Sequence, residues 1–359
     1  MPTAKIVAWT MCRRRATPAT CSVETKIRMR KNDLIENKRI SWIDIGKGIG
    51  IILVIAGHTF LNNWFYVWLN SFHMPFFFLL AGILCNPRST KINLQKKIEN
   101  FIIPFFLFVA FQALFWTLID HKFHSFNIGP IWFLLGIFGV ELFSQMILRI
   151  TKGSVIENVD ACVIVALCHA IMTIVSGNHV IIRPALIVLN GTTYYLIGTQ
   201  LHALFCQKRI DKSLYTHRIE LALCALLIGI LSIWSSNHNG VINMYKNTSN
   251  NYALFYLNAL LGSAFLIGIS ITLWKNKVLE FLGRNTVIIL GTHNQVKLVL
   301  MVVLSRVTSI PVNILRNSWG GTVIVVLTLG IELLVIHIFE EARKRMTGTN
   351  FDILIRFMK

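Results

Sequence analysis

Charged residues are scarce in this sequence of 359 residues. Only 14% of the residues are charged, whereas 54% are hydrophobic, and the mean hydropathy is +0.61. Soluble globular domains carry about 25% charged residues. The composition therefore excludes an ordinary soluble domain and predicts an integral membrane protein.

Acidic residues are the scarcest of the charged ones. The chain has 16 Asp and Glu against 35 Lys and Arg, which gives a formal net charge of +19. A nucleic-acid-binding protein gathers its basic residues on one patch, whereas here they are distributed over many short loops. We therefore expect no nucleic-acid partner and interpret the basic residues as markers of orientation in a lipid bilayer.

Cysteine pairs of the kind that bind metals or form disulfide frameworks are also lacking. The seven cysteines show no CxxC pair and no spacing typical of metal ligands. Most of them fall within apolar stretches or basic loops, where cysteine serves as a small apolar residue. We expect neither a disulfide framework nor a bound metal.

Ten apolar stretches have the length that crosses a bilayer as a helix. They predict an all-α integral membrane protein with about ten transmembrane helices. The stretches lie near residues 43–61, 68–85, 101–119, 131–149, 160–176, 184–205, 219–236, 252–274, 286–305 and 320–340.

The basic residues alternate between the two ends of these stretches. Of the Lys and Arg residues, 28 lie in the terminal tails and the even-numbered loops, and only five lie in the odd-numbered loops. Because basic loops remain in the cytoplasm, both termini are predicted to be cytoplasmic. We divide the chain into a basic, disordered cytoplasmic tail at 1–40, a membrane domain at 41–341 and a basic cytoplasmic tail at 342–359.

The first apolar stretch, DIGKGIGIILVIAGHTF, carries three residues that lipid disfavours: Asp44, Lys47 and His58. Eleven residues at about 100° each end about 20° beyond three full turns, so Lys47 and His58 share one face, about 16 Å apart. Asp44 lies on the same side, one turn before Lys47. Either the three residues face a protein cavity, or Asp44 and Lys47 are interfacial and His58 is structural.

A second polar group follows in SFHMPFFFLLAG, residues 71–82. Ser71 has the character of a helix cap and Pro75 suits a first turn, so the helix is predicted to start there, with His73 at its start. The connection from the preceding helix is then about ten residues long, which makes the two helices antiparallel neighbours. We expect His58 and His73 to face one cavity.

Five motifs follow one another along the chain: Asp44-x-x-Lys47 with His58 after ten further residues, FHMPFFFLLAG at 72–82, KKIENFIIPFF at 96–106, IWFL at 131–134 and FLGRNTVIILGTH at 281–293. Together they resemble the acyltransferase family 3 membrane proteins, and among these the fucose 4-O-acetylase-like sugar O-acetyltransferases. The resemblance covers about residues 39–340. It departs from the family at one place, where an Arg-x-x-Arg pair is common and this chain has Lys97 and Asn100.

The resemblance implies a ten-helix enzyme of the cell (plasma or inner) membrane. Such an enzyme takes an acetyl group from cytoplasmic acetyl-CoA, a co-substrate, and transfers it to a hydroxyl of a cell-surface or exported saccharide. The resemblance assigns catalysis to His58 and the basic partner position to Lys47. Lys97, together with Asp44 and Lys47, is a candidate for the donor-binding side.

Imidazole suits acyl transfer because the acceptor hydroxyl needs a base that works near neutral pH. His58 either removes the hydroxyl proton or attacks the thioester and carries the acetyl group itself; the sequence leaves both routes open. Lys47, near the cytoplasmic end, is placed to meet the donor phosphates, or it only pairs with Asp44. Asp44 lies about 20 Å from His58 along the helix, too far to orient the imidazole.

Further polar residues are candidates for the cavity wall. His293 has Lys297 one turn later, and Glu332 and His337 lie on the last predicted helix; these four are candidates for closing the cavity. Trp132 is interpreted as a packing or interfacial residue, and alternatively as an aromatic platform for a sugar.

His169 and His202 have no such polar residues near them in the sequence, and we expect them to make structural hydrogen bonds.

A different class of function also fits the sequence. A transporter or flippase for a sugar would use Asp44, Lys47 and His58 for proton coupling. Such a protein would depend on an ion gradient and would not incorporate acetyl groups.

Overall fold

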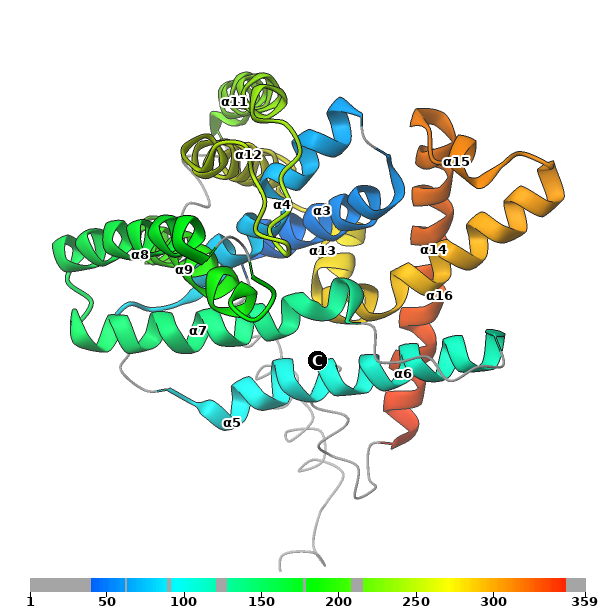
Figure 1. Cartoon of the computed structure of the whole chain (residues 1–359), viewed down its shortest axis with the longest axis horizontal. Helices are drawn as coiled ribbons and strands as arrows, with labels where there is room; N and C mark the ends of the chain where they lie inside the picture. Colours follow the sequence, from blue (N-terminus) through cyan, green and yellow to red (C-terminus); the bar gives the residue numbers. More distant parts are fainter. Residues whose placement is uncertain are drawn as a thin grey trace, which may run out of the picture. The chain divides into compact units, whose positions relative to one another are not determined.

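The computed structural model describes residues 40–61, 63–88, 92–120, 128–176, 179–207 and 216–346 (Figure 1). The two predicted tails therefore lie outside the described residues, except for residue 40 and residues 342–346. The chain divides between Ser41 and Trp42 into two units, and the description below concerns the second. Within the described ranges every regular element is a helix, which confirms the all-α class, and one isolated β-bridge joins Asn243 to Thr248.

The helices follow one another through short turns and loops. In chain order they are α3 (Ser41–Thr59), α4 (Trp64–Leu84), α5 (Leu94–Lys97), the π-helical turn η2 (Ile98–Ile102), α6 (Ile103–Asp120), the 3-10 turn η3 (Gly129–Ile131), α7 (Trp132–Ile150), α8 (Val155–Ser176), α9 (Arg183–His202), the π-helical turn η4 (Ala203–Gln207), α11 (Arg218–Asn239), α12 (Tyr252–Thr272), α13 (Lys277–Arg284), α14 (Thr286–Thr308), α15 (Val312–Leu315) and α16 (Ser318–Met346).

Nine helical segments in the described part of the chain are long and apolar enough to cross a membrane. They make this a multi-pass membrane protein, as predicted. The segments are Ser41–Thr59, Trp64–Leu84, Leu94–Ile119, Gly129–Ile150, Val155–Ser176, Arg218–Asn239, Tyr252–Thr272, Thr286–Thr308 and Trp319–Glu341.

A further long helix, α9, occupies the predicted stretch 184–205 but is not one of these nine. It packs against α4, α7 and α8, and none of residues 186–200 is exposed. Since α9 is surrounded by protein rather than lipid, it tolerates polar residues and needs no apolar outer surface. Its buried polar residues include Asn190, Thr192, Thr193 and Thr199. The number of ten crossings stays a prediction.

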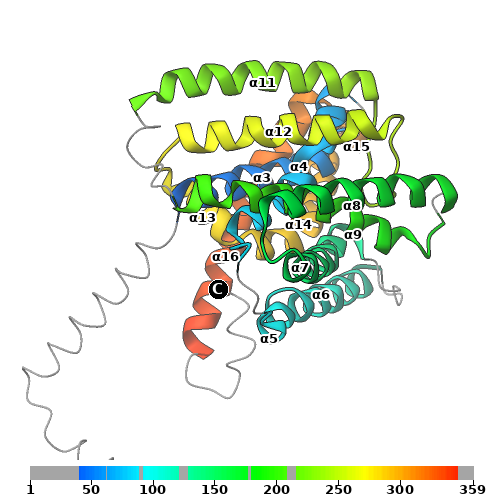
Figure 2. The ribbon, with the colours of Figure 1, turned by 90° about the vertical axis from the view of Figure 1, so that its left-hand side faces the viewer.

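α4 is the helix around which the other elements of the site gather. It packs against α7, α9, α11 and α12; Figures 1 and 2 show α11 beside α12 and α6 beside α7. The contact with α9 is made backbone to backbone. A Cβ atom on Gly82 would lie 2.0 Å from the Tyr195 carbonyl oxygen, and one on Gly198 would lie 2.2 Å from that of Leu79. A side chain at either glycine would force the two helices apart.

The start of α4 differs from the prediction. The helix begins at Trp64, and the side chain of Asn63 caps it by accepting a hydrogen bond of 2.8 Å from the Tyr66 amide. Asparagine is among the preferred capping residues because its side-chain oxygen satisfies an amide of the first turn. Only four residues therefore separate α3 from α4, rather than about ten.

The assignment of Ser71 as a cap and Pro75 as a first-turn residue is therefore wrong. Ser71 is buried inside α4, where its hydroxyl donates to the Trp68 carbonyl over 2.7 Å, and Pro75 lies in the helix interior. Membrane helices tolerate an interior proline because neighbouring groups satisfy the backbone that it frees. His73 consequently lies in the body of α4 and not at its start.

The motif FLGRN forms the second half of α13 and the capping residue after it; no apolar stretch predicted this short helix. α13 contacts the first half of α3 with no side chain between the two backbones. A Cβ atom on Gly48 would lie 2.1 Å from the Leu279 carbonyl oxygen, and one on Gly283 would lie 1.8 Å from that of Asp44. This contact fixes the part of α3 that carries Lys47.

Candidate active site

Two adjoining cavities lie along the polar face of α3. The first, here called the Lys47 cavity, has a volume of about 360 Å³ and is lined by Lys47, Ile51, Asn100, Glu141 and apolar residues of α4, α7 and α14. The second, the His58 cavity, has about 320 Å³ and is lined by His58, His73, Trp132, Tyr245 and three asparagines. Both cavities are lined by Val54, Met74 and Leu290, so they meet at these three side chains.

At one end of this pair of cavities, Lys47 and Asp44 form an ion pair of 3.9 Å. Both side chains are partly exposed, with 30% and 16% of their surface accessible. A partly exposed ion pair at this spacing contributes at most about 1 kcal/mol to stability. Lys47 also lines the cavity, so its ammonium group places a positive charge at this end of it.

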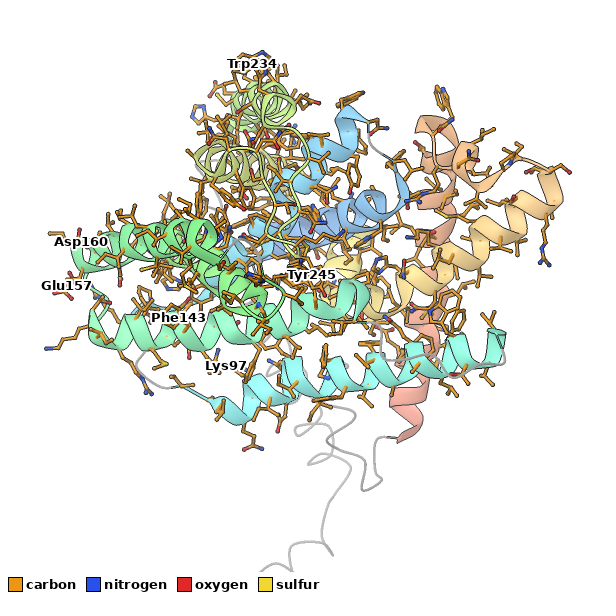
Figure 3. The ribbon with its side chains drawn as sticks, viewed as in Figure 1. Lys97, Phe143, Glu157, Asp160, Trp234 and Tyr245 are labelled. Carbon is orange, nitrogen blue, oxygen red and sulfur yellow. The ribbon has the colours of Figure 1, made fainter. Side chains whose placement is uncertain are left out.

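Lys97 is buried and pairs with Glu141 of α7. Figure 3 shows Lys97 between the α5–α6 run and α7. Glu141 lines the Lys47 cavity, whereas Lys97 does not. The structure thus pairs Lys97 with Glu141, outside the residues that line this cavity, and the place of Lys97 on the donor-binding side stays a prediction.

Asn100, at the place where the family often has a second arginine, does line the Lys47 cavity. It belongs to η2, the π-helical turn that joins α5 to α6. A π-helical turn changes the direction of the side chains that follow it, and such turns are frequent at functional sites. Here the turn brings Asn100 and Phe101 into the wall of the cavity.

At the other end, three histidines from three helices come together. The rings of His58 and His293 lie 5.5 Å apart between centroids, and His58 and His73 line the same cavity. His58 is partly exposed to this cavity, whereas His73 and His293 are buried. His58 is therefore the histidine of the three that is most open to a ligand.

The neighbours of His73 and His293 fix the position of their protons. The Nδ1 atom of His73 lies 2.6 Å from the Leu69 carbonyl oxygen, and that of His293 lies 2.8 Å from the Ile289 carbonyl oxygen. A carbonyl oxygen only accepts, so each Nδ1 carries a hydrogen, and the Nε2 atom of the neutral ring keeps its lone pair. Nε2 of His293 is buried without a hydrogen-bond partner in the described part of the protein.

Two cations hold the end of α3 that carries His58. The ammonium group of Lys297 donates to the His58 carbonyl over 2.9 Å. Arg316 donates from Nε to the Thr59 carbonyl over 2.9 Å and from Nη2 to the His58 carbonyl over 3.3 Å. The last carbonyls of a helix lack partners within the helix and carry partial negative charge, so cations stabilise them there. The backbone of His58 is thereby fixed from α14 and from the turn before α16.

The remaining wall of the His58 cavity is aromatic and amide-rich. Trp132, at the start of α7, packs against Tyr245 with 5.6 Å between ring centroids and the ring planes tilted by 37°; Figure 3 shows Tyr245 near this end of α7. Asn70, Asn243 and Asn294 also line the cavity. Amides both donate and accept hydrogen bonds, and aromatic faces pack on apolar ring surfaces.

Other residues singled out in the sequence lie elsewhere. Glu332 is buried and accepts a hydrogen bond of 2.8 Å from Thr292, the residue before His293, but it lines neither cavity. His337 is exposed. His293 and Lys297 also line neither cavity; they contact the ring and the carbonyl oxygen of His58 instead. The expectation that these four residues close the cavity is therefore not confirmed.

The expectation of structural hydrogen bonds is confirmed for the other two histidines. His202 bonds to the Ile83 carbonyl through Nδ1 at 2.7 Å. His169 bonds to Asn247 and Tyr256, both at 2.9 Å.

The residues of the two cavities and their frame that were not recognised in the sequence include Glu141, Asn243, Tyr245 and Arg316. Glu141 offered a signal, since an acidic residue within a predicted transmembrane stretch marks a functional candidate. Asn243, Tyr245 and Arg316 belong to connecting segments, where only the folded chain brings them to His58.

The sequence model of one protein family, acyltransferase 3, described as an acyltransferase domain, matches residues 40–337. No curated protein and no solved structure matches the chain.

Proposed function

We propose a specific reaction for this chain, which belongs to the acyltransferase 3 family and is therefore a membrane acyltransferase. The chain transfers an acetyl group from acetyl-CoA to a hydroxyl of a cell-surface or exported saccharide, and it works in the cell membrane. The family membership selects the enzyme from the two classes that the sequence left open.

The meeting of the two cavities carries this proposal. The Lys47 cavity is mostly apolar and has a cation at one end, which suits a long thioester arm with phosphates. The His58 cavity holds imidazoles, amides and an aromatic pair, which suits a polyhydroxyl acceptor. Lys47 and His58 are about 16 Å apart along α3, a span for an extended pantetheine arm. The thioester carbon then reaches the junction at Val54, Met74 and Leu290.

The chemistry follows from an imidazole beside a thioester and an alcohol. His58 takes the proton of the acceptor hydroxyl while the hydroxyl oxygen attacks the thioester carbonyl carbon. A carbon–oxygen bond forms, the carbon–sulfur bond breaks, and the CoA thiolate leaves and takes up the proton from the imidazolium. In a second route the imidazole attacks first and carries the acetyl group until the hydroxyl displaces it. The chain's own residues serve either route.

The test is acetyl transfer by the full-length protein, purified and reconstituted in liposomes. The donor is radiolabelled acetyl-CoA, and the acceptor is surface glycan extracted from cells that lack the gene. His58→Ala is expected to lose roughly 10²- to 10⁴-fold in transfer, the contribution of a positioned base. His73→Ala is expected to lose less. Each variant should keep its thermal melt and its binding of a non-hydrolysable thioether analogue of acetyl-CoA.

His337→Ala is the matched control, because this histidine is exposed on α16 and lines neither cavity. It should transfer acetyl groups at the rate of the unaltered protein. A fully active His58→Ala enzyme would eliminate the mechanism and leave His58 as a structural residue.

The side from which the donor approaches follows from the charge distribution. With 28 basic residues in the tails and even-numbered loops against five elsewhere, the end of α3 near Lys47 faces the cytoplasm. Reporter fusions after Lys246 and at Lys359 should then report opposite sides of the membrane. Finding both on one side would contradict this orientation.

A further inference from the structure

The loop between α11 and α12, residues 240–251, forms part of the wall of the His58 cavity through Asn243, Met244 and Tyr245. The loop is closed on itself. Asn243 and Thr248 exchange two backbone hydrogen bonds of 3.0 Å, so residues 244–247 form a tight turn. Met244 is buried at the base of this turn.

Asn247 anchors the turn to the helices beneath it. Its backbone has φ of +51°, a left-handed conformation that asparagine adopts more readily than most residues, and its side chain is buried. The side-chain nitrogen of Asn247 donates to the Thr173 hydroxyl over 2.9 Å, and its backbone carbonyl accepts from the Tyr252 hydroxyl over 2.7 Å. Residues from α8 and α12 thus hold the turn at one point.

His169 completes this anchor with a hydrogen bond at each ring nitrogen. The side-chain oxygen of Asn247 only accepts, so the Nε2 atom of His169 at 2.9 Å carries the hydrogen. The Nδ1 atom of the neutral ring is then an acceptor, and the Tyr256 hydroxyl donates to it over 2.9 Å. The side-chain nitrogen of Asn190 also lies 3.4 Å from this Nε2, farther than the Asn247 oxygen. The short hydrogen bonds at both ring nitrogens favour one arrangement of the loop.

The cavity that the loop helps to line has a particular chemistry. Tyr245 packs against Trp132, and the three asparagines and two histidines supply the polar groups. Among the described residues that line this cavity there is no Lys, Arg, Asp or Glu. An anionic sugar buried here would need a cation or a set of strong donors, whereas an uncharged sugar ring matches amides with its hydroxyls and aromatic rings with its C–H face.

We propose that the 240–251 loop is the acceptor-selecting wall of the His58 cavity and that it selects an uncharged sugar unit. Asn243 and Tyr245 contact the acceptor, and Asn247 and His169 are positioning residues that hold these two in place. This inference rests on the proposed function, since it names the acceptor class and the residues that recognise it.

The test uses the full-length reconstituted enzyme and 4-nitrophenyl glycosides as probes. The neutral probes are the β-glucoside, the β-galactoside and the α-fucoside, and the charged probe is the β-glucuronide. Acetylated product is measured by mass spectrometry, and donor binding is measured with the thioether analogue of acetyl-CoA. We expect at least one neutral glycoside to be acetylated with a kcat/KM roughly tenfold or more above that of the glucuronide, which pays for desolvating an unpaired charge.

Variants of the loop separate recognition from general damage. Tyr245→Ala is expected to raise the KM for the neutral glycoside roughly three- to tenfold, the usual contribution of an aromatic contact. Asn247→Ala should raise the same KM without changing donor affinity, because the anchor lies on the acceptor side. Lys246→Ala is the control: it alters an exposed side chain of the same turn and keeps the backbone amide that donates to Asn243.

The outcomes distinguish failure of this inference from failure of the proposed function. If the donor analogue binds but the glucuronide is preferred, or no neutral glycoside is acetylated, the proposal that this loop selects an uncharged sugar is wrong. The same holds if Tyr245→Ala and Asn247→Ala leave the acceptor KM at the level of Lys246→Ala. If Asn247→Ala fails to fold, Tyr245→Ala and Asn243→Ala alone decide. Absence of both donor binding and acetyl transfer would refute the proposed function itself.

Discussion

The two adjoining cavities differ in what holds them together. The Lys47 cavity is framed by helices that meet backbone to backbone, as at Gly48 and Gly283, and its two ionic groups pair with neighbours outside the cavity. The His58 cavity is framed by hydrogen bonds from a loop and from two cations. The first frame admits a long, largely apolar chain; the second fixes the orientation of a few polar groups. A donor arm and a polar acceptor make these two different demands.

The junction between the cavities gives the strongest test of this contrast. Met74→Phe adds volume where both cavities meet and should keep the thioester carbon away from the hydroxyl. We expect acetyl transfer to fall roughly 10²-fold, as for a displacement of about 1 Å at a reacting centre. Binding of the thioether analogue should change less than about threefold.

Met301→Phe is the matched control for the junction. Met301 is also buried, but it packs with Leu315 and Ile324, outside both cavities. If the two variants lose transfer activity to the same degree, overpacking alone explains the loss and the cavities do not work as one path.

The cations on the end of α3 provide the next test. Lys297→Met removes the charge-assisted hydrogen bond that Lys297 donates to the His58 carbonyl, and it is expected to lower kcat roughly tenfold. Donor KM should stay constant because Lys47 is distant. Arg316→Gln should act in the same direction and less strongly. Initial rates at varied donor concentration measure the split. Lys297→Arg should restore part of kcat, and an equal rise in donor KM would show that the effect is not confined to the His58 end.

Substitutions of Lys47 test the opposite end of α3, in the Lys47 cavity. Lys47→Ala should raise donor KM roughly tenfold through loss of a charged contact to phosphate, and Lys47→Arg should stay within about threefold of the unaltered protein. Acceptor KM should not change in either variant. Unchanged donor KM in both would return Lys47 to an interfacial role beside Asp44.

Lys97 provides the smallest expected change in catalysis. Because Lys97 pairs with Glu141 beside the cavity, the double variant Lys97→Met, Glu141→Gln should keep donor KM within about threefold, since the net charge of the pair is zero before and after the change. Each single variant should melt at a lower temperature than the double variant, because it leaves one partner of the buried pair alone. A large donor effect in the double variant would make Lys97 a donor-binding residue after all.

Membrane setting and helix positions were largely predictable, because hydropathy over about 20 residues is a strong local signal. The polar stripe of α3 was also predictable, since helix geometry alone puts Lys47 and His58 on one face. α9 shows the limit of this signal: its mixed composition reports a position among other helices, which sequence does not record locally. The prediction of where α4 starts was wrong, because Pro75 is a strong local signal for a first turn and the tertiary structure overrides it.

The assembly of the site was less predictable than its central residue. His58 was found through its position on an apolar helix, and His293 through a motif. The contacts that give these residues their setting join segments more than 200 residues apart, as between Lys297 or Arg316 and the end of α3. Tyr245 and Asn247 carry no sequence pattern, because a tight turn is anchored by the helices beneath it and these meet only in the fold.

The hydrogen bonds from Arg316 to the end of α3 also bear on how the chain is inserted into the membrane. Arg316 is one of the five basic residues on the side with few positive charges, yet its guanidinium group bonds to the backbone of α3. A cation used in this way stabilises the folded bundle and does not act as a free loop charge in the final structure. If Arg316 lost its charge, the 28 basic residues of the tails and even-numbered loops would still far outnumber those of the odd-numbered loops. Neutralising Arg316 should thus weaken the bundle and leave its orientation unchanged.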